Sequence, residues 1–171
     1  MGIAHDPWID RLASLFRLHP AWREAARAID PRSTSNVYFT HRPGEPWHLE
    51  RRGDLTLLLP GAAPDPDFAF RFPSGAVARL EAVRGESNDF AAELFALALD
   101  EDPEVRVEVR AIASFPRLLK RGYVRLLLAS GSRVRALGAT HGARGINGVR
   151  RLVAAVRASG PRDWESVTAP G

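Results

Sequence analysis

The stretch Val105–Gly138, VRVEVRAIASFPRLLKRGYVRLLLASGSRVRALG, decides the fold that this chain is expected to adopt. Over 105–110, valines alternate with charged residues, which is the period-two pattern of a half-buried β-strand. Two short apolar helices separated by glycines follow, and another short strand is expected over 133–137. This order predicts two apolar helices laid over a sheet, an arrangement that forms a natural wall for a hydrophobic pocket.

The two helices carry most of the large apolar side chains of this stretch. The first begins after Ser114, a candidate N-cap, and ends at Gly122. The second covers Tyr123–Ala129 and ends at Gly131. Together they supply candidate ligand contacts, namely Phe115, Leu118, Leu119, Tyr123 and Leu127.

This stretch resembles the closing part of sterol carrier protein type-two domains. That part runs strand, helix, Leu-x-x-Gly turn, short helix, Gly-Lys strand and last helix. Leu119–Gly122 is similar to the Leu-x-x-Gly turn, and Ser130–Gly138 is similar to the Gly-Lys strand, with Arg133 and Arg135 in place of lysines. The resemblance covers mainly residues 68–158.

Two features depart from the family pattern. Leu127 and Leu128 stand where the family has paired aromatic residues, and 139–145 lengthens the link to the last helix. The resemblance implies a small α+β module that binds or transfers lipid in an apolar tunnel between sheet and helices. It implies no catalysis and no cofactor.

The segment 6–29 is predicted to be an N-terminal amphipathic helical segment. Asp6 is a candidate N-cap with Pro7 at the first helical position. His19-Pro20 should interrupt the helix, because proline biases the residue before it away from helical angles. Core packing, a dimer surface and an interfacial anchor are all compatible with its apolar face.

Four further strands are expected before the deciding stretch. A hairpin over 36–41 and 47–51 is expected to turn at Pro43–Pro46, because Pro-Gly-Glu-Pro is a strong turn sequence. Further strands are expected over 55–59 and 68–72, and their alternating faces fit a sheet with one side packed on helices.

Helices are expected over 74–83, capped by Ser74, and over 90–99, capped by Asn88 or Asp89. The helix over 90–99 is apolar on more than one side, which indicates burial or a place beside a ligand-filled cavity. It supplies four more candidate ligand contacts, namely Phe90, Leu94, Phe95 and Ala98.

The predicted fold class is therefore α+β. We expect an antiparallel or mixed sheet of about five to six strands, covered on one face by helices, with the N-terminal amphipathic helical segment beside it. A single domain is expected over 1–160, and a C-terminal tail over 161–171.

Composition excludes several classes of function. The chain has no cysteine, so disulfides, thiol nucleophiles and thiolate metal sites are absent. Its twenty-three arginines against the single Lys120 indicate a GC-rich genome and a bacterial-like composition rather than a function. The N-terminus shows no signal peptide and no apolar run is long enough to span a bilayer, so a cytoplasmic location is expected.

The net charge of +4 hides an asymmetry along the chain. Residues 120–162 hold ten basic and no acidic residues, whereas 1–119 holds fourteen basic and eighteen acidic residues. A basic end of this kind can meet anionic lipid headgroups or nucleic acid. It can equally pair with the acidic remainder of the same fold.

A glycine-rich stretch, Thr140–Gly148, leads into a basic amphipathic helix expected over 145–159. Glycines at a helix start can expose backbone N–H groups to an anion. The stretch matches neither the Walker loop nor the dinucleotide fingerprint, and its alternative role is a loop into the closing helix of the domain. The candidate anion-binding residues are Arg144, Arg150 and Arg151.

No catalytic or metal-binding constellation emerges from the sequence. His41 and His48 lie near the ends of the first hairpin, but no third ligand stands at metal spacing beside them. Asp65 and Asp67 lie in a proline-rich loop and are predicted to be solvated. We therefore expect no catalytic residue, no metal and no cofactor.

The sequence favours non-catalytic binding or transfer of a lipid or another hydrophobic small molecule, with an anionic membrane surface as a candidate docking partner. The alternative is a module that binds nucleic acid or another anionic partner through the basic segment. Against that alternative, Tyr123 is the only aromatic residue of the basic segment before Trp164, and single strands need stacking platforms. An enzyme ranks last, and the sequence does not specify an oligomeric state.

Overall fold

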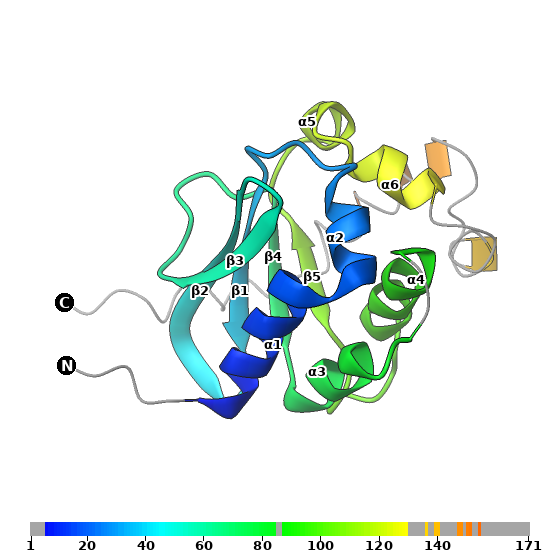
Figure 1. Cartoon of the computed structure of the whole chain (residues 1–171). Coiled ribbons are helices and arrows are strands. Elements are labelled where there is room, and N and C mark those ends of the chain that lie inside the picture. The colour runs from blue at the N-terminus through cyan, green and yellow to red at the C-terminus, as the bar shows by residue number, and fades with distance from the viewer. Residues whose placement is uncertain are drawn as a thin grey trace.

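A computed structural model describes residues 6–84 and 87–129, together with the helical positions 136, 139–140, 147–148, 150–151 and 154. Within these residues, one five-stranded sheet has the order β3-β2-β1-β4-β5 (Figure 1). β1 and β4 run parallel, whereas all other neighbouring strands run antiparallel, so the sheet is mixed. The strands are β1 (Thr34–Phe39), β2 (Arg42–Arg52), β3 (Leu55–Pro60), β4 (Phe68–Phe72) and β5 (Glu108–Ala111).

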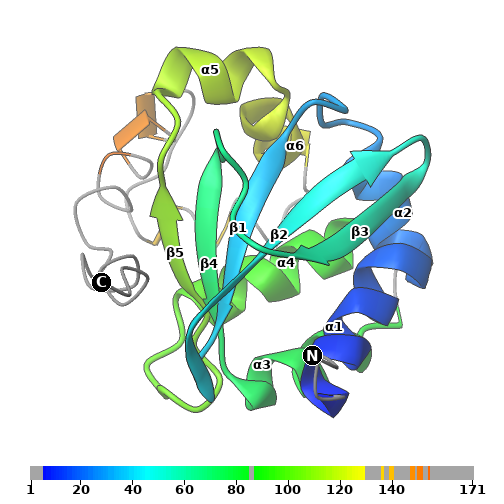
Figure 2. The same cartoon turned by 90° about the vertical axis from the view of Figure 1, so that its left-hand side faces the viewer.

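Helices cover one face of this sheet. In Figure 2 the sheet lies toward the viewer, α2 and α4 lie behind it, and α1 lies beside β3. The α+β class, the mixed sheet and the N-terminal helical segment are thereby confirmed. The helices are α1 (Pro7–Leu18), α2 (Pro20–Ala26), α3 (Ser74–Glu81), α4 (Ser87–Ala98), α5 (Phe115–Lys120) and α6 (Tyr123–Ala129).

The N-terminal helices form as their local signals predict. The Asp6 carboxylate accepts a hydrogen bond from the Trp8 N–H at 2.9 Å and caps α1, and His19 is extended before Pro20. The apolar face of α1 packs into the main core, so core packing is its observed role. Its buried residues are Ile9, Leu12, Leu15 and Phe16.

The predicted turn of the first hairpin is wrong. The chain reverses at Thr40-His41, where Phe39 pairs with Arg42. Residues 43–46 instead form a bulge in β2 opposite Tyr38, and Gly44 has a positive φ of 81°. A bulge accommodates prolines that have no N–H group to donate to the sheet.

The deciding stretch folds close to its prediction at its centre and less closely at its ends. α6 has its predicted bounds, and Gly122 ends α5 with a φ of 88°. β5 begins at Glu108 rather than Val105, because the Val107 N–H donates to Leu97 O, at 3.0 Å, instead of to a neighbouring strand. Ser114 is the N-cap of α5 but makes no side-chain capping bond.

The other helix ends differ by a few residues. Pro73 rather than Ser74 is the N-cap of α3, and α4 begins at Ser87, ahead of its predicted caps. The strand predicted over 133–137 lies outside the described residues except at Ala136, which is helical rather than extended. The described positions within 145–159 are helical, as predicted, and the tail over 161–171 lies outside the described residues.

Candidate functional site

An apolar cavity of about 260 Å³ lies between the helix-covered face of the sheet and the helices α2, α4 and α6. Strand β4 supplies its floor, and the opposite walls come from α4 and from the N-terminal helices. The apolar side chains around it are Phe16, Trp22, Ala26, Ile29, Leu49, Phe68, Phe70, Phe72, Ala91, Leu94, Phe95, Ala98, Val109, Leu118, Val124 and Leu126.

The cavity exists because large side chains on its two sides do not close on one another. The three phenylalanines of β4 share one face, since side chains of a strand alternate with a period of two. Phe68 and Phe70 nevertheless stay only partly buried, as do Leu94 and Phe95 on α4. Protein cores are normally packed to the density of organic crystals, so this region of the core is built to leave space.

Few polar groups line the cavity, and most of them are already engaged. The Trp22 Nε1–H donates to Thr56 Oγ1 at 3.0 Å. Arg51 Nη1 donates to the carbonyl oxygens of Ala26 and Ile29, both at 2.8 Å. The wall is therefore apolar in character, with its polar groups tied to the protein.

A buried carboxylate, Asp67, holds α5 and α6 in place over the sheet. We call this helical segment, residues 115–129, the lid of the cavity. Its side chain has no exposed surface and accepts hydrogen bonds from Arg117 Nε at 2.8 Å and Arg121 Nη1 at 2.7 Å. The Tyr123 hydroxyl donates to the same carboxylate at 3.2 Å. One side chain thus fixes α5, the turn after it and the start of α6 over the sheet.

The backbone of Asp67 extends the same anchor. Its N–H donates to Thr34 O at 2.8 Å, and its carbonyl accepts from the N–H groups of Ile112 and Ala113 at 2.9 and 3.0 Å. The prediction that Asp67 is solvated is therefore wrong. Asp65, two residues earlier, has a 70% exposed side chain and fits that prediction.

The α5–α6 turn also rests on the loop that follows α2. The Asp30 N–H donates to Arg121 O at 2.9 Å, and Arg125 Nη2 donates to Ala28 O at 3.0 Å. Gly122 lies so close to this loop that a Cβ atom there would be 2.2 Å from Ala28 O. The start of α6 is thereby held both by Asp67 and by the loop after α2.

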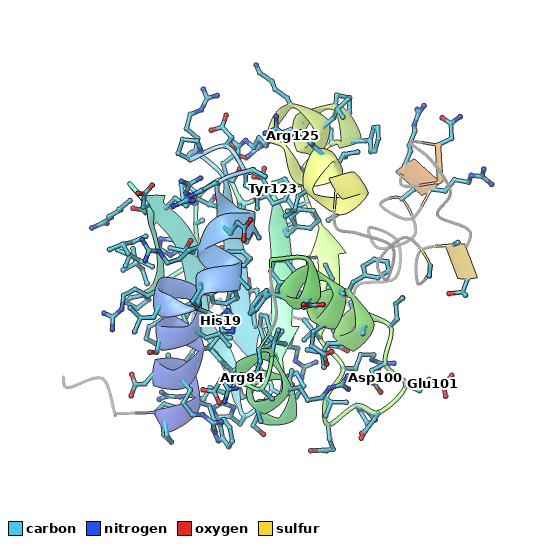
Figure 3. The ribbon with its side chains drawn as sticks, turned by 45° about the vertical axis from the view of Figure 1, so that its right-hand side comes forward. His19, Arg84, Asp100, Glu101, Tyr123 and Arg125 are labelled. Atoms are coloured by element: carbon cyan, nitrogen blue, oxygen red, sulfur yellow. The ribbon has the colours of Figure 1, made fainter. Side chains whose placement is uncertain are left out.

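Tyr123 connects the lid to the cavity wall. It lies between α6 and the sheet (Figure 3), with its ring edge-on to Phe68 at a centroid distance of 4.9 Å. Burial raises the pKa of the phenol above its ordinary value, and the negative charge of Asp67 raises it further. Tyr123 is therefore a neutral hydrogen-bonding group and not a base.

The structure brings five of the predicted ligand contacts to the cavity and leaves the others elsewhere. Those that line it are Leu94, Phe95, Ala98, Leu118 and Tyr123. Phe90 is fully buried in the core behind the wall, with its ring 5.7 Å from that of Trp22. Phe115 is half-buried, and neither it nor Leu119, which is 45% exposed, is among the described lining residues.

Of the four remaining predicted site residues, two are described in full and two are not. Leu127 lies in α6, but its side chain is outside the described residues. Arg144 is outside them altogether. Arg150 and Arg151 occupy exposed helical positions.

Sequence reasoning missed the contribution of the N-terminal helices and the sheet. Phe16 and Trp22 belong to faces that read as ordinary amphipathic core, and nothing in a sequence separates a core residue from a cavity wall. One usable signal was present in β4, where FAFRF places three phenylalanines on a single strand face.

Glu50 and the two candidate histidines are already paired within the protein. In the described part of the chain, no three histidine or acidic side chains are grouped to hold a metal ion. Glu50, at the cavity edge, is paired with Arg52 at 2.7 Å, and this hydrogen bond lowers the pKa of its carboxyl group. His41 and His48 bind Asp6 and the carbonyl oxygen of Gly61 respectively, both at 2.8 Å.

Comparison with solved structures finds a chain named "UbiJ-SCP2 Ubiquinone synthesis protein". The two chains superpose with a TM-score of 0.41 and 16% sequence identity, over 69% of this chain and 84% of that chain. That protein carries the name of the kind of domain that the sequence resembles, but the likeness is too weak to carry a functional argument. No family model matches this chain, and no curated protein matches it.

Proposed function

We propose that this protein binds a hydrophobic small molecule or lipid in the cavity between its sheet and its helices, without catalysis. The observation that carries the proposal is the unfilled apolar space between Phe68 and Phe70 on the sheet and Leu94 and Phe95 on α4. Burial of apolar surface stabilises a complex by roughly 25 cal/mol per Å² before ordering costs. A cavity of about 150 Å³ already holds benzene, so the 260 Å³ cavity accepts a larger ligand.

Transfer of such a ligand, a cytoplasmic location and a single domain over 1–160 remain predictions from the sequence. In the described part of the chain, no helix is long and apolar enough to cross a membrane.

Mass spectrometry of small molecules that co-purify with the native protein tests the proposal directly. A bound apolar compound is the expected result.

Filling the cavity should abolish binding without unfolding the protein. Ala98 lines the cavity at the end of α4, and Ala98→Phe puts an aromatic ring into the space. We expect affinity for the uncharged fluorescent dye N-phenylnaphthylamine to fall on the order of tenfold or more. Thermal stability should be kept or raised, because the ring gains contacts in a void.

The matched control is Ala78→Phe, which adds the same ring on the exposed surface of α3. It should leave dye affinity unchanged, as followed by fluorescence titration. Equal dye affinity for Ala98→Phe and the wild type would place the dye elsewhere and contradict the proposal.

Docking on an anionic membrane is a second part of the proposal, supported by the exposure of Arg150 and Arg151. Binding to vesicles that contain anionic lipid should weaken with salt, because charges are screened over about 8 Å at physiological ionic strength. Arg150→Gln with Arg151→Gln should weaken vesicle co-sedimentation more than the control pair Arg23→Gln with Arg27→Gln, which removes two exposed charges from α2 and its C-cap. Equal binding to neutral vesicles, or tighter salt-sensitive binding to duplex DNA, argues against membrane docking.

A further inference from the structure

Hydroxyl groups gather at the part of the cavity where β1 begins. Ser33 and Ser35 both line the cavity and are buried, with 7% and 6% of their surface exposed. Within the part of the chain that the structure describes, the buried Ser33 Oγ forms no hydrogen bond of normal geometry. A buried hydroxyl without a partner destabilises a folded protein, so native structures rarely keep one.

The Tyr123 phenol lies beside the two serines. Ser33 directly precedes β1 and Ser35 lies in it, and both line the same cavity. Both hydroxyls lie near enough to the phenol oxygen to act on it as hydrogen-bond donors, which lowers the pKa of Tyr123 against the rise that burial and Asp67 cause. The phenol already donates its proton to Asp67. Of the three hydroxyl groups, only those of Ser33 and Ser35 are therefore left to donate a hydrogen bond to a ligand.

The charged groups that line or adjoin this part of the cavity already have hydrogen-bond partners inside the protein. Asp67 is neutralised by Arg117 and Arg121. The guanidinium group of Arg51 donates to three backbone carbonyl oxygens, those of Ala26, Ile29 and Gly53. An anionic head group buried here would have to compete with these carbonyl groups for Arg51, and a buried charge that is left unpaired is strongly unfavourable.

We infer that the ligand carries an uncharged oxygen head group, an alcohol or a carbonyl, that accepts hydrogen bonds from the hydroxyls of Ser33 and Ser35. Its apolar part then lies along Phe68 and Phe70 toward α4. This inference rests on the proposed function, because it names the ligand class of the same cavity. It also explains why a buried hydroxyl is kept without a hydrogen bond of normal geometry inside the protein.

The test compares three molecules with the same chain length, n-octanol, n-octane and octanoate, as competitors of N-phenylnaphthylamine at a pH where octanoate is ionised. Wild-type protein should prefer octanol over octane on the order of tenfold, the effect of a hydrogen bond or two, and should bind octanoate more weakly than octanol. In Ser33→Ala with Ser35→Ala the preference for octanol should disappear while octane affinity stays the same. Ser114→Ala, an exposed serine that makes no capping bond, is the control.

A second measurement separates a binding role from a structural one. Ser33→Ala removes a buried hydroxyl without a partner, so the melting temperature of the ligand-free protein should stay the same or rise. A clear fall in melting temperature would show that Ser33 has a structural partner and would overturn the inference.

The competition outcomes also separate this inference from the proposed function. If no competitor displaces the dye and the dye itself does not bind, the proposed function fails. If octane and octanol compete equally in the wild type, the cavity binds apolar molecules but the hydroxyl subsite is refuted. If octanoate competes best, the uncharged head group is refuted in favour of an anion bound at Arg51.

Discussion

Replacing Asp67 with alanine is expected to lower the free energy of unfolding by about 3 kcal/mol, within the range for breaking a buried ion pair. The carboxylate is fully buried and binds Arg117, Arg121 and Tyr123, so its removal leaves three donors without their acceptor. The two arginines keep 27% and 18% side-chain exposure and regain some hydration. That relief places the expected loss toward the lower end of the range.

The control is Asp65→Asn, because Asp65 pairs with the same Arg117 at 2.7 Å but has a 70% exposed side chain. Exposed ion pairs contribute little, since water and salt already screen them. Urea denaturation should therefore separate the two variants clearly. A loss for Asp67→Ala no greater than that for Asp65→Asn would show that burial of this carboxylate does not anchor the fold.

The same variant connects stability to the cavity. Asp67 holds the start of α6 through Tyr123, and Tyr123 packs on Phe68 in the cavity wall. Dye affinity of folded Asp67→Ala should therefore fall, because the lid is no longer fixed over the sheet. Asp65→Asn should bind the dye like the wild type.

Elements with strong local signals were predictable from the sequence. FAFRF gave β4 its predicted bounds, and the glycine at Gly122 placed the boundary between α5 and α6. Asp6 followed by Pro7 marked the start of α1. In each case neighbouring residues alone determine the conformation, through side-chain alternation, a capping carboxylate or a glycine with positive φ.

Features that depend on distant residues were not predictable. The turn at Thr40-His41 replaced the turn expected at Pro43–Pro46, because pairing with β1 accommodates those residues in a bulge. The parallel pairing of β1 with β4 joins segments separated by two intervening strands. Local propensity holds no information about such partners.

The residues that line the cavity show most clearly that contacts between distant residues could not be predicted from the sequence. The apolar faces of α4, α5 and α6 were predicted to contact a ligand, yet Leu119 points to solvent and Phe90 packs in the core. Asp67 was predicted to be solvated because it follows prolines, but its two arginines lie fifty residues or more away in sequence. Tertiary packing alone decides which residues face the cavity.

Replacing Gly122 is the second change from which we expect a large effect. Gly122 has a φ of 88°, a conformation that costs a residue with a side chain about 1–3 kcal/mol. A Cβ atom there would also lie 2.2 Å from Ala28 O, which is backbone and cannot rotate away. Gly122→Ala should therefore lower the free energy of unfolding in two ways, by strain in its own backbone and by displacement of the loop after α2.

Gly53 provides the matched control for this prediction. It also has a positive φ, of 63°, but a Cβ atom there would meet nothing within 4 Å. Gly53→Ala thus measures the backbone strain alone, and the difference between the two variants in urea denaturation measures the close approach. We expect Gly122→Ala to lose at least about 1 kcal/mol more, the low end of the cost of overpacking, and to bind the dye more weakly because α6 shifts. Equal losses for the two variants would mean that the α5–α6 turn does not rest on the loop after α2, and the cavity lid would then need another anchor.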